Sequence, residues 1–299
     1  MDGIIVVDKP PEMMSARLVS RVKRTLKAGK VGHAGTLDPF ATGVMVCLIN
    51  RGTRLAEFFL HGGKAYNATL CLGVETDSQD FTGNVVRSRA VRPGDFSKAD
   101  IISVFRDFEG ESRQIPPCFS AVKHRGKPLY QYARKGIRVE KPPRPIHIFS
   151  LEPEVIDPPF VRFSVRCSGG TYIRTLCHDI GQRLGCGAHL TSLRRTEACG
   201  FTLNDATGLD IIEKQAEAGE AAELVIGMNK ALRHLPGYIA DETLTAYVGN
   251  GRQLTDSVFP DGVKTDTRGY FKLVDKTGRL LAVIHRQPGG FRYCCVFSA

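Results

Sequence analysis

The apolar positions along the first two thirds of the chain follow two patterns. Short apolar runs indicate buried strands, and apolar residues three or four positions apart indicate amphipathic helices. The first run, residues 3–7, ends before Pro10, and a helical pattern then begins at Ser15 and ends at Gly29. Further strands are expected at residues 44–49, 64–72, 146–155, 161–167 and 189–197. Further helices are expected around residues 55–59, at 98–108 and 129–133, after 171, and at 211–229.

The pattern changes at about residue 237. Short alternating runs separated by Gly and Asp turns then predict a small β domain, with runs at residues 269–274, 280–284 and 291–297. We therefore expect an α+β fold, with a large domain over residues 1–236 and an all-β domain over residues 237–299. Within the large domain, residues 30–42 are expected to form a loop. Residues 110–145, which are basic and rich in Pro and Gly, are expected to form an insertion.

Composition narrows the class of protein. The chain has 299 residues, of which 42% are hydrophobic and 24% charged, as in globular proteins of about two domains. Its longest uncharged stretch that we find, residues 39–50, is too short for a membrane span of about 20 residues, and the N-terminus lacks a signal-peptide pattern. The 9 cysteines have irregular spacing and no Cys-x-x-Cys pair, so we expect neither a disulfide framework nor a zinc site. A cytoplasmic protein is the resulting expectation.

The charge points to a polyanionic partner. The net charge is +10, and the excess is concentrated rather than spread. Between residues 17 and 54 Asp38 is the only acid among 8 Lys and Arg, and between residues 123 and 144 Glu140 is the only acid. Such basic segments favour nucleic acid, because each neutralised phosphate releases counterions.

Common enzyme signatures are absent from the sequence, including the phosphate-binding loop, the Gly-x-Ser-x-Gly elbow, His-Glu-x-x-His and the zinc-deaminase pattern. The consecutive trio Cys177-His178-Asp179 cannot form a catalytic triad, since neighbours on a helix point in different directions. Asp38, in the glycine-punctuated segment 32–43, leaves two interpretations open. It caps a turn before Pro39, or it is an ionised carboxylate with a lowered pKa that serves as a nucleophile or an electrostatic stabiliser.

The segment 32–43 resembles the catalytic loop of TruB-type pseudouridine synthases, in which Gly-His-x-Gly-Thr-Leu-Asp-Pro surrounds a nucleophilic aspartate. Further family motifs occur in the family's order over roughly residues 3–200, namely at residues 8–10, 64–66, 115–123, 167–176 and 188–195. Two positions depart from the pattern. Glu12 stands where the family usually has Gly, and Ala34 where it often has Thr or Ser.

The resemblance implies that a uridine in RNA is isomerised to pseudouridine, by breaking the glycosidic bond, turning the uracil and rejoining it through carbon 5. It implies a mostly antiparallel mixed sheet flanked by helices, followed by a PUA-like domain. Asp38 would be the nucleophile, attacking either the sugar or the base, and Arg174 would keep it ionised. Tyr66 would stack on the uracil and assist proton removal. The resemblance also assigns the substrate-binding residues His33, Tyr172 and Leu193.

The resemblance also implies the family's usual target, which is the T-loop of tRNA at position 55. It implies no cofactor, no metal and no obligatory protein partner. A monomer is expected, without membrane association. The cations expected to contact RNA are Lys9, Lys64, Lys123, Arg125, Arg194 and Arg195. Three alternatives remain open: a guide-RNA-directed synthase of the H/ACA type, a non-catalytic RNA-binding or RNA-folding protein on the same fold, and a metal-dependent RNA hydrolase.

Overall fold

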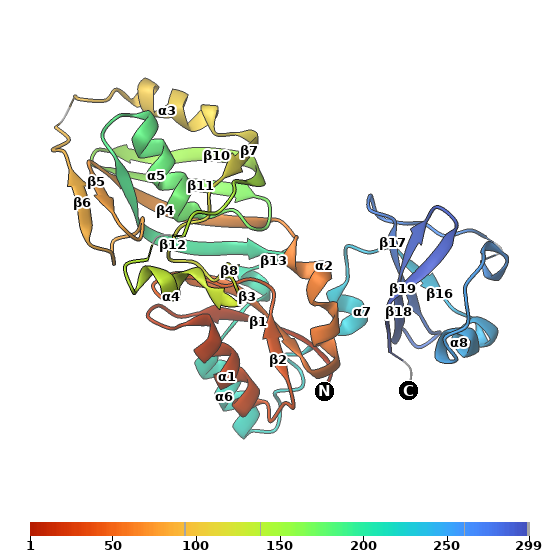
Figure 1. Ribbon diagram of the computed structural model, residues 1–299. Coiled ribbons are helices and arrows are strands. Elements are labelled where there is room, and N and C mark those ends of the chain that lie inside the picture. The colour runs from red at the N-terminus through yellow and green to blue at the C-terminus, as the bar shows by residue number, and fades with distance from the viewer. Residues whose placement is uncertain (93, 138, 260, 298–299) are drawn as a thin grey trace.

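A large mixed sheet organises most of the chain in a computed structural model, which describes residues 1–92, 94–137, 139–259 and 261–297. The main path of this sheet runs β14-β1-β3-β12-β4-β11-β10-β7 (Figure 1). Only the pairings β1 with β14 and β12 with β3 on this path are parallel, so the expected mixed, mostly antiparallel sheet is confirmed. Its principal strands are β1 Gly3–Lys9, β3 Thr42–Ile49, β4 Lys64–Leu72, β7 Gly110–Gln114, β10 Arg144–Asp157, β11 Phe160–Cys167 and β12 Ala188–Ala198. The remaining strands of this sheet are β2 Val31–His33, β13 Phe201–Thr202, β14 Thr207–Gly208 and β15 Ile226–Gly227.

The central strands are continuously apolar because both faces of the sheet are covered. Along β1, alternate residues enter different cores: Ile5 packs toward α1 Ser15–Thr25 and α6 Leu209–Glu217, whereas Ile4 faces the opposite core. The helices α1 and α6 lie side by side, joined by an ion pair between Arg21 and Glu213 at 2.6 Å (Figure 1). The other half of the sheet is covered by α3 Lys98–Asp107 and α5 Ile173–Arg183.

Three predictions for the large domain are wrong in detail. The segment expected as a loop contains β2, which pairs with β3. The insertion is shorter than expected, because β7 and the start of β10 belong to the main sheet. It spans residues 115–143 and contains the strands β8 Lys123–His124 and β9 Lys127–Pro128 and the helix α4 Leu129–Ala133. The helix expected at 211–229 is interrupted: α6 ends at Glu217, and the short α7, Met228–Ala231, follows β15.

A separate small β domain follows, as expected. Its four-stranded sheet has the order β16-β17-β18-β19, with β16 Gly237–Ile239, β17 Tyr270–Val274, β18 Leu280–Gln287 and β19 Gly290–Val296. It also contains a helix that the sequence pattern did not predict, α8 Glu242–Gly249, capped by the Asp241 carboxylate, which accepts from the backbone N–H of Leu244 at 2.7 Å. Residues 298–299 lie outside the described residues.

The two parts share a hydrophobic core. Phe58 of α2 Ala56–Leu60 meets Tyr270 of β17 edge to face, with ring centroids 5.5 Å apart. Val283 and Phe297 of the small domain belong to the same buried cluster as Phe59. No helix among the described residues is long and apolar enough to cross a membrane.

Two shorter features complete the fold. The hairpin of β5 Val74–Thr76 and β6 Val85–Ser88 stands beside the end of β12 that starts at Ala188. Short 3-10 helices occupy residues Asn50–Leu55, Leu203–Asp205 and Asp256–Val258. The β5–β6 hairpin matters for the site, because its connecting turn contains a buried carboxylate, Asp80.

Candidate active site

The loop between β2 and β3 presents the Asp38 carboxylate. Ser15, the first residue of α1, holds this loop from one side: its hydroxyl donates to the Leu37 carbonyl and accepts from the Leu37 N–H, both at 2.9 Å. The Ala41 N–H donates to the Asp38 carbonyl at 3.1 Å and closes a turn. The Asp38 side chain is 29% exposed, so a fixed backbone presents a carboxylate that a ligand can reach.

Arg174, in the first turn of α5, binds both oxygens of that carboxylate. Its Nε and Nη2 donate to Asp38 Oδ2 and Oδ1 at 2.9 and 3.0 Å. Its other N–H groups donate to the carbonyls of Ser78 and Phe119 at 2.9 and 2.8 Å. Bidentate charge-assisted pairs fix geometry as well as charge. The structure therefore brings Asp38 and Arg174 together and gives the carboxylate one orientation.

A second carboxylate, Asp80, lies 3.6 Å from Arg174 Nη1 and is 6% exposed. The Ser78 hydroxyl and the Thr82 N–H donate to its Oδ1 at 2.8 and 3.0 Å. The sequence patterns did not mark residues 77–83 as part of a site, so this contact was not predicted. The turn-forming residues were visible, but their approach to Arg174 depends on how the β5–β6 hairpin packs against α5.

The electrostatics of Asp38 differ from the expectation. Burial raises the pKa of its carboxyl; Arg174 and Lys9 oppose the rise, and the Asp80 charge adds to it. The predicted direction, a pKa lowered by surrounding cations, is wrong because loss of water outweighs the cations. Strongly perturbed carboxyl groups with a specific charge partner cluster at functional sites.

Tyr66 and Leu193 come from adjacent strands beside the Asp38 loop. Tyr66 lies on β4 and Leu193 on β12, and both are buried, at 6% and 8% exposure. They belong to the same core cluster as Leu37 and Ala41, which flank Asp38 in the loop. Burial raises the pKa of Tyr66 to about 12. Its phenol therefore keeps its proton at neutral pH.

Tyr172 and His33 stand at two element ends. Tyr172 is the N-cap residue of α5, and its backbone exchanges hydrogen bonds of 2.8 and 3.0 Å with the Gln114 side chain. His33 ends β2, and its Nδ1 accepts from the Gly35 N–H at 3.2 Å. Burial, together with the nearby Arg195 charge, lowers the pKa of His33.

Three cations that were expected to contact RNA are buried instead. Lys9, Lys64 and Arg195 are 0%, 8% and 1% exposed. Lys9 Nζ donates to three backbone carbonyls, among them that of Pro39 at 2.9 Å, and burial lowers its pKa to about 8. Lys64 likewise donates to backbone carbonyls, and burial lowers its pKa. The expected RNA contact does not fit these positions, because the charged groups are already enclosed and partnered.

Arg195 is the largest of these three buried side chains. Its Nε donates to the Val44 carbonyl at 2.6 Å, and its Nη2 and Nη1 reach the carbonyls of Gly35 and Thr36 at 3.2 and 3.5 Å. These carbonyls belong to the loop that presents Asp38 and to the following strand. Arg195 is therefore part of the support beneath the loop.

The other expected RNA contacts lie on the surface. Lys123 and Arg125 are exposed on the β8–β9 hairpin, where Arg125 and Gly126 have φ of 48° and 80°. Arg194 is half-buried and pairs with Asp8 through hydrogen bonds of 2.8 and 3.1 Å. Its guanidinium thus faces a carboxylate of its own chain.

Metal-binding geometry is absent from the part of the chain that the structure describes: no three His, Cys, Asp or Glu side chains there are grouped to hold an ion. All nine cysteines are free thiols. Cys177 is fully enclosed in the core, and burial raises its pKa, which agrees with the rejection of the 177–179 trio as a nucleophilic triad.

Family comparisons cover the elements of this site. Residues 23–173 match the TruB family pseudouridylate synthase N-terminal domain, and residues 174–235 match the tRNA pseudouridylate synthase B C-terminal domain. The chain is 48% identical over 238 residues to tRNA pseudouridine synthase B of Geobacter sulfurreducens, covering 79% of this chain and 77% of the relative. It is 38% identical to tRNA pseudouridine synthase B of Bacillus subtilis, covering 96% and 94% of the two chains.

Solved structures show the same architecture. A crystal structure of a Cbf5–Nop10–Gar1 complex matches with a TM-score of 0.74 and 28% identity, over 99% of this chain and 84% of that chain. An H/ACA ribonucleoprotein bound to a substrate RNA matches with a TM-score of 0.71 and 28% identity, over 95% and 78% of the chains.

Fold and family matches together define an isomerase, a pseudouridine synthase. The chain belongs to the TruB family of pseudouridylate synthases.

Proposed function

We propose that this protein isomerises a uridine in the T-loop of tRNA, at position 55, with Asp38 as the nucleophile. The observation that carries the proposal is the bidentate pair of Asp38 and Arg174, at 2.9 and 3.0 Å, in a site where Asp38 keeps 29% exposure. Relatives at 38–48% identity that bear the name tRNA pseudouridine synthase B support tRNA as the substrate.

Each residue has a distinct task in this proposal. Asp38 attacks the sugar or the base once the nucleotide has left its stack, which costs a few kcal/mol and least in a loop. Arg174 holds the carboxylate ionised and oriented. Tyr66 stacks on the uracil; with a pKa of about 12 it acts as a neutral phenol rather than as a phenolate base. Tyr172 and Leu193 shape the uracil pocket, and His33 meets the RNA beside the vacated position.

RNA contacts are assigned to the exposed cations. Lys123 and Arg125 lie on the β8–β9 hairpin, within the segment 115–143 that also contributes the Phe119 carbonyl to Arg174. A T-arm bound between this segment and the sheet would touch both the phosphate-binding cations and the Asp38 loop. Lys9 and Arg195 are reassigned to holding the Asp38 loop, whose carbonyls they bind, and Lys64 to holding the turn after α2, because all three charges are enclosed.

We infer that the enzyme acts on tRNA as a monomer, without a cofactor, a guide RNA or an obligatory protein partner. Identity is higher to the curated tRNA pseudouridine synthases than to the Cbf5 complexes, at 38–48% against 28%. Nine free thiols are typical of a reducing compartment, which supports a cytoplasmic location.

The test uses tRNA transcript labelled with tritium at uracil carbon 5, because rejoining through that carbon releases the label. Native protein in EDTA is expected to release about one tritium per tRNA, and T-loop mapping is expected to place the product at position 55. Asp38→Asn is expected to bind the tRNA and release none. If the native protein binds tRNA but releases no tritium, the proposal is overturned in favour of a guide-dependent or purely RNA-binding role. Strand cleavage that EDTA abolishes would point to a metal-dependent hydrolase.

A further inference from the structure

Arg195 and Tyr66 are direct register partners on the neighbouring antiparallel strands β12 and β4. Residues paired in this way have their side chains on the same face of the sheet, with Cβ atoms about 4.5–5.5 Å apart. Both side chains are buried, at 1% and 6% exposure. The sheet thus places an enclosed guanidinium beside the phenol that is proposed to stack on the uracil.

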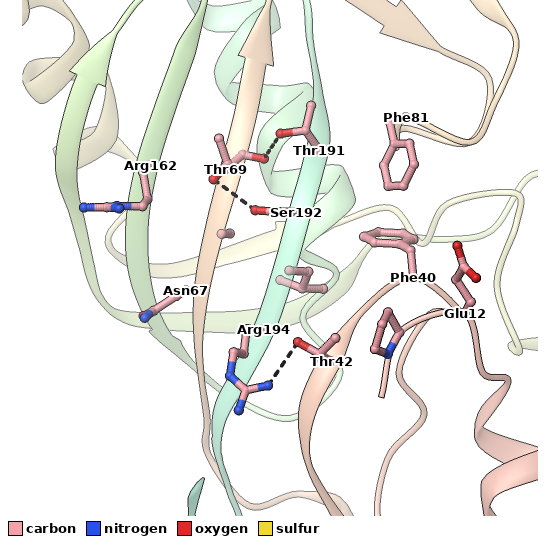
Figure 2. Close-up of a pocket in the computed structure, with 13 residues that line it drawn as sticks. Glu12, Phe40, Thr42, Asn67, Thr69, Phe81, Arg162, Thr191, Ser192 and Arg194 are labelled. Carbon is pink, nitrogen blue, oxygen red and sulfur yellow. Dashed lines mark hydrogen bonds between the residues drawn. The ribbon is translucent and has the colours of Figure 1, made fainter. Parts of the chain in front are cut away.

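The next register pair marks the other face of the sheet. Asn67 and Arg194 are partners one position along and line a surface cavity of about 330 Å³, and Figure 2 shows both projecting from their strands. Because successive side chains of a strand point to opposite faces, Tyr66 and Arg195 point away from this cavity. Tyr66 packs in the same core cluster as Leu176 of α5. The pair therefore lies on the face of the sheet that α5 covers.

The Arg195 guanidinium also holds the Asp38 loop. Its Nη2 and Nη1 donate to the loop carbonyls of Gly35 and Thr36 at 3.2 and 3.5 Å. One buried side chain therefore contacts both the loop that presents the carboxylate and the strand partner that presents the phenol.

Hydrogen-bond chemistry sets the direction of the Tyr66 proton. Burial raises the pKa of Tyr66 to about 12; Arg195 opposes the rise by its charge and by a hydrogen bond, whereas Cys167 and Asp38 add to it. Arg has five donors and no acceptor, so the phenolic oxygen accepts from Arg195 and the O–H proton of the neutral phenol points elsewhere. Among the described residues no protein group accepts that proton. It is therefore free for a substrate.

The proposed isomerisation moves one proton in each direction. Breaking the glycosidic bond leaves an electron pair on nitrogen 1 of the uracil, and the product carries a hydrogen on that nitrogen. Rejoining through carbon 5 releases the hydrogen of that carbon and restores the ring double bond. Because turning the ring brings carbon 5 to the place that nitrogen 1 held, one hydroxyl beside that place can serve both transfers.

We propose that Arg195 is a positioning residue that acts through Tyr66. It donates to the phenolic oxygen and so aims the hydroxyl at the uracil. Tyr66 enters as a neutral phenol, gives its proton to nitrogen 1 as the glycosidic bond breaks, and recovers a proton from carbon 5 once that carbon has bonded to the sugar. A phenolate exists only between these transfers, stabilised by the adjacent guanidinium. The inference rests on the proposed function, since it needs a uracil at the Asp38 site.

A double-mutant cycle on the single-turnover rate of tritium release tests this role. Arg195→Met is expected to slow release about 100-fold when Tyr66 is present. In Tyr66→Phe it is expected to slow release by no more than about 10-fold, because only the support of the Asp38 loop is then lost. The Kd for tRNA is expected to stay native in each variant, since Arg195 is 1% exposed.

Two rescue variants separate this role from a structural one. Arg195→Lys keeps a charged donor and is expected to recover about 10-fold of the lost rate, but only with Tyr66 present; it also carries the cycle if Arg195→Met does not fold. 3-Fluorotyrosine at position 66 is a more acidic phenol and is expected to recover about 5-fold in Arg195→Met. Arg166→Met, from the exposed face of β11, is the control and is expected to act equally in both backgrounds.

The outcomes separate the two proposals. Equal effects of Arg195→Met with Tyr66 and with Tyr66→Phe, while native protein releases tritium, would overturn the role and leave Arg195 as support of the loop alone. No recovery with 3-fluorotyrosine would overturn the proton donation. Native turnover by Tyr66→Phe would overturn both transfers and leave the proposed function standing. Absence of tritium release by native protein would overturn the proposed function itself.

Discussion

Arg174 lies between Asp38 and Asp80, with two hydrogen bonds of 2.9 and 3.0 Å to the first carboxylate and a 3.6 Å contact to the second. One buried cation thus compensates two acids, and it cannot be removed without leaving buried charge unpaired. The Asp80 carboxylate also accepts hydrogen bonds from Ser78 and Thr82, so it has partners besides Arg174. Asp38 therefore depends on Arg174 more than Asp80 does.

The first prediction concerns the pH dependence of activity in Arg174→Lys. Burial raises the pKa of Asp38 and Arg174 lowers it, so loss of the bidentate pair moves that pKa further upward. If ionised Asp38 is the reactive form, activity falls as pH drops through its pKa, and the acid limb of the single-turnover profile moves to higher pH in the variant. The rate at pH 7 is expected to fall about 100-fold from lost positioning. An acid limb at the native pH would contradict this assignment.

Arg195→Met tests the support beneath the Asp38 loop. The substitution leaves the carbonyls of Gly35, Thr36 and Val44 without their buried donor, which is expected to cost about 2–4 kcal/mol in the free energy of unfolding. Arg125→Met, on the exposed hairpin, is the matched control and is expected to change stability by less than about 0.5 kcal/mol. Urea unfolding measures both. Equal stability of the two variants would show that Arg195 does not hold the loop.

Gly43→Ala tests the close approach of the β3 and β12 backbones at Arg195. A Cβ on Gly43 would lie 2.2 Å from the Arg195 carbonyl oxygen, and Gly43 has φ of 102°. The neighbouring atom belongs to the backbone and cannot move aside, and an alanine at this positive φ is itself strained. We therefore expect a loss of more than about 3 kcal/mol in the free energy of unfolding. Gly227→Ala is the control, since no atom lies within 4 Å of its added Cβ. A native-like Tm for Gly43→Ala would contradict the close approach of β3 and β12.

The order of strands explains which parts of the site could be predicted. Apolar runs located β1 and β3, because both faces of each are buried and the signal is local. The family motifs located Asp38 and Arg174 but not the burial of Arg195, because a cation inside a basic sequence looks the same whether it faces RNA or the protein interior. Its burial results from β12 lying between β3 and β4. Asp80 was missed for a similar reason, since a turn does not indicate which helix it will contact.

Lys123→Ala combined with Arg125→Ala tests the exposed hairpin as an RNA-binding element. If each side chain neutralises one phosphate, the slope of log Kd against log salt concentration is expected to become shallower by about 0.7–0.9 per contact, and affinity to fall for all tRNAs alike. Arg134→Ala with Lys135→Ala, two exposed residues that follow α4 in the same segment, shows whether the effect belongs to the hairpin. An unchanged salt slope in the first variant would exclude these two phosphate contacts.

Tyr66→Phe separates stacking from the chemistry of the phenol. The ring remains, so tRNA affinity is expected to stay native, while loss of the hydroxyl is expected to slow turnover by about 100-fold or more if that group takes part in proton transfer. Burial raises the pKa of Tyr66 to about 12, so native activity is expected to show no alkaline limb from this residue below about pH 11. Single-turnover tritium release between pH 6 and pH 10 measures both effects, with Tyr130→Phe on the partly exposed α4 as the control. Native turnover by Tyr66→Phe would restrict Tyr66 to stacking on the uracil.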